Sequence, residues 1–341
     1  MNRQAPTLED VAREAGVSRA TVSRVVNGVR NVDPSIQDLV RGAIERTGYT
    51  PNRAARALVT RRTGAVALIV SGAGDAFAGR VFADPFFGRV VNGVVGYLRA
   101  RSTQPILLFA ESEAARRQVV DYVGQGGTDG ALVVSVRPDD PLPDMLLAAR
   151  VPTVLFARPA RATPVGCVDL DHRAGGRLAG QHLLARGCRR IAVIGAPPDL
   201  RASRERLAGF RDALARAGHD SPPVAEGVFT LDSGAAAMTT LLHDHPEVDG
   251  VFAANDLMAQ GACQVLRELG RRIPEDVAVV GFDDSSVAVT CRPPLTTVRQ
   301  PVEDMAAAMA RMLGEQVQGT VTRTEPRTLV FEPQLVVRES A

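Results

Sequence analysis

The chain has few cysteines, and none of them are paired at metal-binding spacing. Its 341 residues include Cys167, Cys188, Cys263 and Cys291, which lie far apart with no CxxC arrangement. Zinc sites typically use cysteines or histidines at short spacing, and disulfide-stapled domains are small and rich in cysteine. We therefore expect reduced, mostly structural thiols, and we expect no metal and no cofactor.

Long hydrophobic runs are also missing. No apolar stretch typical of a signal peptide opens the sequence, and none reaches the roughly 18 residues of a membrane helix. The expectation is a cytoplasmic protein without a membrane partner. The enzyme signatures HExxH, GxSxG and GxxxxGK(S/T) are absent as well.

Lysine is absent, so all 40 basic residues are arginine, and they are unevenly distributed. Residues 1–62 hold 11 arginines against 6 acidic residues, a net charge of +5. The remainder holds 29 arginines and 32 acidic residues, a net charge of −3, which leaves +2 for the whole chain. A basic N-terminal region on a near-neutral body indicates that only this region meets a polyanion. The length fits about two domains, or two plus a small module.

The stretch from Thr7 to Asn27 predicts two short helices joined by a tight turn. Thr7 can cap the first helix with Asp10 as its capping-box partner, and Gly16 supplies the permissive backbone that a sharp helix exit needs. Ser18 is suited to cap a second helix that runs to about Asn27. Its inward-facing residues are predicted to be Ala20, Val22, Val25 and Val26, and its outward-facing ones Ser18, Arg19, Thr21, Ser23, Arg24 and Asn27. This arrangement is typical of the helix-turn-helix that reads the major groove of DNA.

A third helix is predicted from Asp33, its cap, to Gly48, with Pro34 in the first turn. Its buried face is expected to contain Ile36, Leu39, Val40, Ala43 and Ile44. A helical hairpin that merely packs on another element would show the same apolar spacing. The polar outer face and the third helix favour the DNA-binding interpretation.

Three segments carry a family resemblance, namely TLEDVAREAGVSRATVSRVVNG (7–28), GYTPN (48–52) and AARAL (54–58). They resemble the N-terminus of the lactose-repressor (LacI/GalR) family of bacterial transcription regulators. The resemblance implies a homodimer on a near-palindromic operator, with a DNA-binding domain at 1–50, a hinge helix at 51–62 and an effector-binding and dimerisation domain at 63–341. Best placed for base readout are Arg19, Ala20 and Arg24. The full set of expected DNA contacts is Thr7, Leu8, Ser18, Arg19, Ala20, Thr21, Ser23, Arg24, Asn27, Asn31, Tyr49, Asn52, Ala55 and Leu58. Leu58 matches the leucine that this family inserts into the minor groove, although the residues alone would favour a plain linker.

After Thr63, apolar runs of strand length alternate with amphipathic helical stretches, which indicates an α/β body with parallel sheets covered on both faces. The runs lie at 65–70, 106–109, 131–136, 153–156, 191–194, 251–254 and 277–282, with a tail strand at 329–337. The family resemblance continues through VD (168–169), GG (175–176), RLAGF (206–210), ND (255–256), GFDD (281–284) and PLTT (294–297). It implies the two-lobed, doubly wound periplasmic-binding-protein type I fold, with crossovers near 160–166, 291–298 and 324–328.

Ligands of such sheets bind beyond the carboxyl ends of the strands. By family position the expected effector shell is Asp84, Phe86, Arg158, Arg206, Asn255, Asp283 and Gln300, a set whose polar groups and aromatic ring suit a sugar. Several have simpler explanations, because Asn255 can be a helix cap and Phe86 can be core. Ala157 stands where relatives often carry an acidic residue, and the segment 71–83 is longer than the family's first loop.

Several functional alternatives remain. The segment GAGDAFAG at 72–79 resembles the signature of ribokinase-type sugar kinases, in which the Asp is the catalytic base. It lies after the first strand of the body, whereas those kinases carry it late in the chain, so a non-enzymatic protein is expected. The effector could also be a purine or another metabolite acting as a corepressor. A sugar-binding transport protein is disfavoured by the basic head. No leucine heptads follow the last strand, so a dimer is expected rather than a tetramer.

Overall fold

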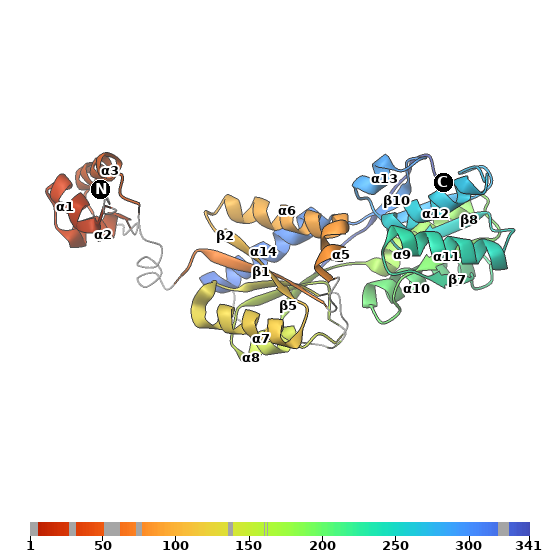
Figure 1. Ribbon diagram of the computed structural model, residues 1–341, viewed down its shortest axis with the longest axis horizontal. Helices are drawn as coiled ribbons and strands as arrows, with labels where there is room; N and C mark the ends of the chain where they lie inside the picture. Colours follow the sequence, from red (N-terminus) through yellow and green to blue (C-terminus); the bar gives the residue numbers. More distant parts are fainter. Residues whose placement is uncertain are drawn as a thin grey trace.

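We analysed a computed structural model of the chain, which describes residues 6–26, 32–50, 62–72, 77–135, 139–159, 161, 163–319 and 327–341. The N-terminal helices α1 (Leu8–Ala15), α2 (Arg19–Val26) and α3 (Pro34–Thr47) form a three-helix head, red in Figure 1. Its core contains Val11, Ala12, Val22, Val40, Ala43 and Tyr49. The predicted boundaries of all three helices are confirmed where they fall on described residues.

The ends of α1 follow the predicted capping chemistry. The Thr7 hydroxyl accepts a hydrogen bond from the Asp10 amide, and the Asp10 carboxylate accepts one from the Thr7 amide at 3.0 Å. Gly16 ends the helix in the left-handed conformation at φ +65°. This reciprocal pair uses two of the amide donors that a helix start leaves without partners. The short helix is thereby fixed before the turn that positions α2.

Two residues of the head lie differently from the prediction. Leu39 is 55% exposed on α3 and Ala20 is exposed on α2, although both were expected to face inward. Val40 and Ala43 already fill the contact between α3 and the rest of the head, so Leu39, one position earlier, is turned out to the surface. The same holds for Ala20, because Val22 takes the core position of α2.

The body contains two lobes, each with a six-stranded sheet whose strand order is β11-β5-β4-β3-β1-β2 in lobe 1 and β12-β10-β9-β8-β6-β7 in lobe 2. The strands of lobe 1 are β1 (Ala65–Ser71), β2 (Gln104–Ala110), β3 (Ala131–Ser135), β4 (Thr153–Phe156), β5 (Gly166–Leu170) and β11 (Thr328–Phe331). Those of lobe 2 are β6 (Ile191–Gly195), β7 (Val224–Glu226), β8 (Gly250–Ala253), β9 (Ala278–Asp283), β10 (Thr296–Arg299) and β12 (Gln334–Val336). Every pairing is parallel except β10 with β12.

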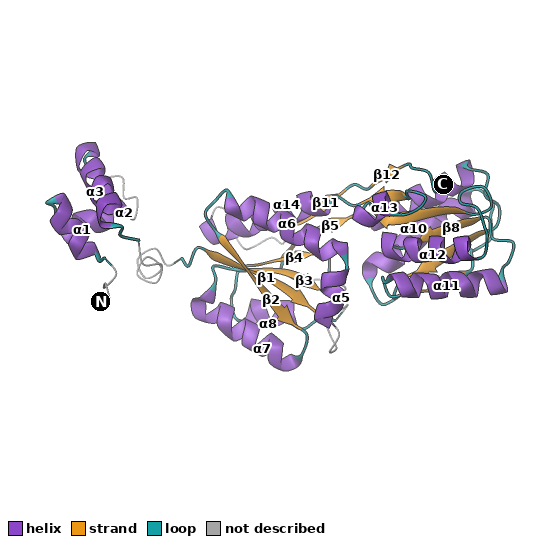
Figure 2. Cartoon of the chain, turned by 45° about the horizontal axis from the view of Figure 1, so that its top comes forward, coloured by secondary structure: helices purple, strands orange, loops and turns teal. Residues whose placement is uncertain are grey.

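Helices cover both faces of each sheet, as Figure 2 shows. Lobe 1 carries α5 (Phe77–Ala83), α6 (Pro85–Arg99), α7 (Glu113–Tyr122), the π-helical turn η1 (Val123–Gly127), α8 (Leu142–Ala148) and α14 (Val302–Gln318). Lobe 2 carries α9 (His172–Ala185), α10 (Arg201–Arg216), α11 (Leu231–Asp244), α12 (Asp256–Glu268) and α13 (Ser286–Thr290). Both faces of strand β1 are buried, which explains why its sequence is continuously apolar. Val66 and Leu68 join the core beneath α6 and α14, whereas Ala67 and Ile69 join the core beneath α7 and α8.

The three predicted crossovers are wrong, because each lies one strand too early: the first two precede strands that the apolar pattern does not reveal, and the third precedes a tail that contains two strands and not one. The chain leaves lobe 1 after β5, returns to it after β10, and leaves it again after β11. β5 contains the buried Asp169, and β10 reads TTVR, so neither has a purely apolar run. The expected single tail strand at 329–337 is in fact β11 and β12, one in each sheet. The short β7 was also missed, and the expected first loop at 71–83 contains α5.

Candidate functional site

A cavity of about 640 Å³ lies among residues contributed by both lobes. All seven residues of the predicted effector shell line it, namely Asp84, Phe86, Arg158, Arg206, Asn255, Asp283 and Gln300. Its size falls within the range typical of small-molecule sites, roughly 300–1,000 Å³. Asp84, Asn255 and Asp283 lie at or just beyond the C-terminal ends of strands or the N-terminal ends of helices, as the sheet architecture predicts.

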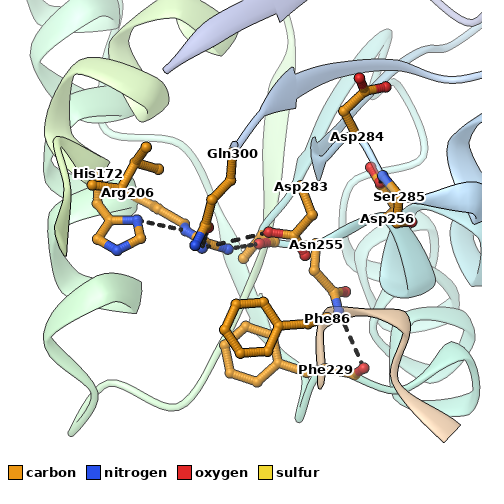
Figure 3. Close-up of polar contacts among 12 residues, drawn as sticks. Phe86, His172, Arg206, Phe229, Asn255, Asp256, Asp283, Asp284, Ser285 and Gln300 are labelled. Atoms are coloured by element: carbon orange, nitrogen blue, oxygen red, sulfur yellow. Dashed lines mark hydrogen bonds and ion pairs between the residues drawn. The ribbon is translucent and has the colours of Figure 1, made fainter. Parts of the chain in front are cut away.

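Arg206 is the central polar residue of the cavity. It comes from the second turn of α10 and is 6% exposed. Its guanidinium donates hydrogen bonds to the Ala254 carbonyl and, at 3.2 Å, to the Gln300 side-chain oxygen (Figure 3). Its planar face lies 3.7 Å from the centre of the Phe282 ring. These contacts fix the guanidinium in one orientation, because a buried arginine must satisfy its donors within the protein.

Asp283 carries a buried carboxyl group whose charge is poorly compensated. Burial raises its pKa to about 8, with the carboxylates of Asp256 and Asp84 adding to the rise and Arg206 and Arg89 opposing it. Among the described residues, its side chain has an ion pair with Arg206 at 3.7 Å and no hydrogen-bond donor. The acceptor capacity of this group is therefore open to a ligand hydroxyl.

Asn255 and Asp84 serve as helix caps as well as lining the cavity. The Asn255 side-chain oxygen accepts a hydrogen bond from the Met258 amide at 2.9 Å, and its amide group donates to the Phe229 carbonyl at 3.2 Å (Figure 3). The Asp84 carboxylate accepts from the Phe86 amide at 2.9 Å. Burial raises the pKa of Asp84. The simpler explanation of Asn255 as a cap is thus correct, and it coexists with a position on the cavity wall.

A second polar group borders the same cavity. Arg158 forms an ion pair with Asp169 of β5, and the His172 ring lies 3.7 Å from the other Asp169 oxygen. Burial, together with the positive charges of Arg206 and Arg158, holds the pKa of His172 well below its usual value of 6.5. The imidazole is therefore neutral near pH 7, and its Nδ1 atom accepts a hydrogen bond from Arg206 at 3.3 Å.

Aromatic rings form much of the apolar wall. Phe86 lies edge-on to Phe87 and Phe156, with ring centres 5.2 and 5.4 Å apart. Phe77 of α5 and Phe229, from the loop before α11, line the cavity as well. Flat apolar rings beside hydrogen-bonding groups match a sugar, which has C–H faces and hydroxyl edges.

Asp169, His172 and Phe229 are among the cavity residues that sequence reasoning missed. Asp169 belongs to the pair Val168-Asp169 that carried part of the resemblance, so a signal was present but was not used. His172 is one of five histidines scattered along the sequence, so no pattern singles it out. Phe229 follows β7, which the apolar pattern did not detect, and it adopts φ +64°, a conformation that nothing in its sequence context indicates.

The head presents a polar surface on α2. Ser18, Arg19, Ala20 and Arg24 are exposed, and Thr21 and Ser23 are half-buried. The Ser18 hydroxyl accepts a hydrogen bond from the Thr21 amide at 3.1 Å, as expected of a cap, and Arg19 lies 3.0 Å from Glu9 of α1. Of the other expected DNA contacts, Thr7 is exposed, Leu8 is half-buried, and Tyr49 is 9% exposed within the head core. Asn27, Asn31, Asn52, Ala55 and Leu58 lie outside the described residues.

No helix in the described part of the chain is long and apolar enough to cross a membrane. In the same residues, no group of three or more His, Cys, Asp or Glu side chains is arranged to hold a metal ion.

Comparisons with known proteins agree with this geometry. Residues 7–52 match the model of bacterial regulatory proteins of the lacI family, and residues 181–341 match the periplasmic binding protein-like domain. The HTH-type transcriptional regulator CelR of Thermobifida fusca is 49% identical over 99% of both chains. The ribose operon repressor of Escherichia coli K12 is 33% identical over 98% of this chain and 99% of that one.

Solved structures give the same result. A transcriptional regulator CelR–cellobiose complex superposes with a TM-score of 0.77 at 46% identity, covering 98% of this chain and 100% of the other. A lac repressor dimer bound to operator and an anti-inducer superposes with a TM-score of 0.83 at 27% identity, covering 99% of each chain. These relatives are transcriptional regulators, and the kinase-like motif at 72–79 does not make this chain an enzyme. The chain belongs to the lacI family of bacterial regulatory proteins.

Proposed function

We propose that this protein is a transcriptional repressor that binds a near-palindromic operator as a homodimer and is released from it by a sugar. The head supports the DNA-binding part, because α2 presents Arg19 and Arg24 on an exposed, hydrogen-bonding surface. The lac repressor structure on its operator supports the dimer, because the likeness covers 99% of both chains. A two-fold symmetric protein would place its two heads on two symmetric half-sites.

We infer that the effector is cellobiose or a closely related glucose disaccharide. The observation that carries this inference is the cavity itself, where Asp283, Asn255 and Arg206 are combined with the aromatic wall around Phe86. The relative solved with cellobiose is 46% identical over 98% of this chain. A sugar pairs its hydroxyls with buried polar groups, which would otherwise be left without partners.

The proposed domain organisation is a DNA-binding domain at 1–50, a hinge at 51–62 and an effector and dimerisation domain at 63–341. Effector binding between the lobes would change their relative angle and so the separation of the two hinges. We further propose that Leu58 of the hinge inserts into the minor groove when the dimer is on DNA. A coupling of about 1–3 kcal/mol would change operator affinity several-fold to more than a hundredfold.

The proposal is tested by fluorescence anisotropy with the purified full-length protein and palindromic duplexes taken from upstream of its own and neighbouring genes. Each titration is repeated with cellobiose, ribose, glucose and guanine at saturating concentration. We expect one palindrome to bind tightly and cellobiose to weaken that binding at least tenfold. Tighter binding with guanine would instead identify a corepressor-type regulator, and the absence of any preferred palindrome would refute the repressor function.

A further inference from the structure

Arg89 connects the two lobes directly behind the effector cavity. It lies in the second turn of α6 in lobe 1 and keeps 18% side-chain exposure. Its Nη1 atom donates a hydrogen bond to the Asp283 carbonyl at 2.7 Å, and its Nη2 atom donates to the Gln300 carbonyl at 3.0 Å. The same guanidinium forms a two-pronged ion pair with Glu303 of α14, with both N–O distances 2.8 Å. All three nitrogens of the guanidinium are therefore used.

The partners of Arg89 belong to different parts of the body. Asp283 is the last residue of β9 in lobe 2, Gln300 lies in the crossover after β10, and Glu303 is in the first turn of α14 in lobe 1. The side chains of Asp283 and Gln300 line the cavity, whereas Arg89 holds their main chains. Arg89 thus contacts the effector site from outside it.

The main chain that Arg89 holds is unusual. Asp283 and Asp284 have φ values of +106° and +52°, in a backbone region that residues other than glycine rarely adopt. Contacts within lobe 2 hold the next two residues. The Asp284 carboxylate pairs with Arg299 at 2.7 Å and Arg338 at 2.6 Å, and the Ser285 amide donates to the Asp256 carboxylate at 2.7 Å. The Asp283 carbonyl accepts a hydrogen bond of 2.7 Å from Arg89 of lobe 1 and a longer one, of 3.4 Å, from the Gln300 amide in the crossover.

We propose that Arg89 is a positioning residue that fixes the Asp283 carboxyl group for effector binding and transmits its movement to α6. This inference rests on the proposed function, because it assigns the mechanical link between that cavity and lobe 1. Charge-assisted hydrogen bonds to main-chain carbonyls are among the stronger polar contacts in proteins. A shift of Asp283 on effector binding therefore pulls on Arg89, and through it on α6 and on the α14 turn that contains Glu303.

The competing explanation is a local one, in which Arg89 only staples α6 to α14 through Glu303. The two helices already pack closely, because a Cβ atom on Gly93 of α6 would lie 2.3 Å from the Glu303 carbonyl oxygen. Glu303→Gln separates the two explanations, since it removes the ion pair and leaves the two carbonyl contacts of Arg89. Arg89→Lys keeps the charge without the planar fork, and Arg99→Ala, at an exposed position in the last turn of α6, is the matched control.

The first measurement needs no ligand. Native-state hydrogen exchange of the full-length protein reports the amides of residues 283–285 in the wild type and in each variant. We expect Arg89→Ala to accelerate their exchange about tenfold or more, as loss of a charge-assisted hydrogen bond implies. Arg89→Lys should give a smaller acceleration, and Glu303→Gln and Arg99→Ala should exchange as the wild type does. Equal protection in Arg89→Ala and Arg99→Ala would overturn the proposal.

The second measurement is operator affinity with and without saturating cellobiose. Arg89→Ala is expected to bind operator within about twofold of the wild type in the absence of sugar. The factor by which saturating cellobiose weakens operator binding should be about tenfold smaller in this variant than in the wild type. Glu303→Gln should keep the full release, and an equal loss in both variants would favour the local staple and contradict the proposal. A wild type that ignores cellobiose would refute the proposed effector, and the exchange experiment would then still decide the role of Arg89.

Discussion

The Nη2 atom of Arg206 lies 3.7 Å from the nearest carboxylate oxygen of Asp283, inside a cavity where both side chains are almost fully buried. This separation is too long for a hydrogen bond, so the two groups attract each other without using their directional bonding capacity. Arg206 instead donates hydrogen bonds to the Ala254 carbonyl and to the Gln300 side-chain oxygen. The pair is therefore arranged so that a ligand hydroxyl group can form a hydrogen bond with the Asp283 carboxyl group.

Replacing Asp283 by alanine should separate effector binding from DNA binding. We expect Asp283→Ala to weaken cellobiose binding about tenfold to a hundredfold, because a buried sugar hydroxyl left without its hydrogen-bond partner costs roughly 1–3 kcal/mol. Operator affinity without sugar should stay within about threefold of the wild type, since the head is untouched. Isothermal titration calorimetry and operator anisotropy measure the two quantities, with Asp121→Ala on α7 as an exposed control. Unchanged sugar affinity would remove Asp283 from the binding site.

The raised pKa of Asp283 has a consequence for stability against pH. The carboxyl group has a pKa of about 8 in the folded protein against its ordinary value of 3.8, so folding favours its protonated form. Its contribution to the free energy of unfolding is fully present below about pH 4 and is lost as pH rises through about 8. The side-chain amide of the Asp283→Asn variant cannot ionise, so its free energy of unfolding should not fall in this way as pH rises.

The expected result is a stability difference that grows with pH. Without effector, Asp283→Asn should gain about 1–3 kcal/mol in free energy of unfolding, relative to the wild type, between pH 5 and pH 9. Urea denaturation across this range measures it, and Asp121→Asn should follow the wild-type curve. A difference that is constant with pH, or that shrinks as pH rises, would contradict the assigned direction of the pKa shift.

Arg24 offers the sharpest test of base readout by the head. The residue is exposed on α2 and far from the turn that caps the helix, so its loss should not unfold the head. We expect Arg24→Ala to weaken binding to the preferred palindrome by about 1–3 kcal/mol and to leave binding to a scrambled duplex nearly unchanged. Arg41→Ala, exposed on α3, is the control. An equal loss on both duplexes would assign Arg24 to phosphate contacts instead.

The sequence predicted the head and the cavity shell well because both depend on local rules. Capping by Thr7 and Asp10 and the left-handed exit at Gly16 are fixed by a few neighbouring residues. The cavity residues follow strands or begin helices, and parallel sheets bring such positions together. All seven residues of the predicted shell accordingly line one cavity.

The features that the sequence did not predict depend on tertiary contacts, which leave no periodic pattern of apolar residues in the sequence. β5 holds the charged Asp169 inside a fully buried strand, because Arg158 compensates it from the segment after β4. The sequence does not show that Arg158 is the partner of Asp169, so β5 does not look like a buried strand. The predicted crossover therefore lies before β5 and not after it. Leu39 has the right spacing for a buried face, but its neighbour Val40 occupies the core. The contacts of Arg89 join residues about two hundred positions apart, which no local pattern indicates.

The close packing of α9 on α10 gives a final prediction, because it sets the position of Arg206. A Cβ atom added to Gly176 of α9 would lie 1.9 Å from the Arg206 carbonyl oxygen and 3.0 Å from the Phe210 amide nitrogen. Both contacts are with the main chain of α10, so the clash cannot be relieved by moving a flexible side chain. Gly176→Ala must push the two helices apart, and Arg206 moves with α10.

We expect Gly176→Ala to lower the free energy of unfolding by about 1–3 kcal/mol and to weaken cellobiose binding. The matched control is Gly96→Ala, within α6, where an added Cβ meets no atom within 4 Å. That variant should be neutral or more stable by up to about 1 kcal/mol, since alanine favours a helix over glycine. Chemical denaturation and calorimetry compare the pair. If Gly176→Ala leaves stability and sugar affinity unchanged, as the control is expected to do, the α9–α10 contact does not set the position of Arg206. A rigid contact there could not accommodate an added methyl group.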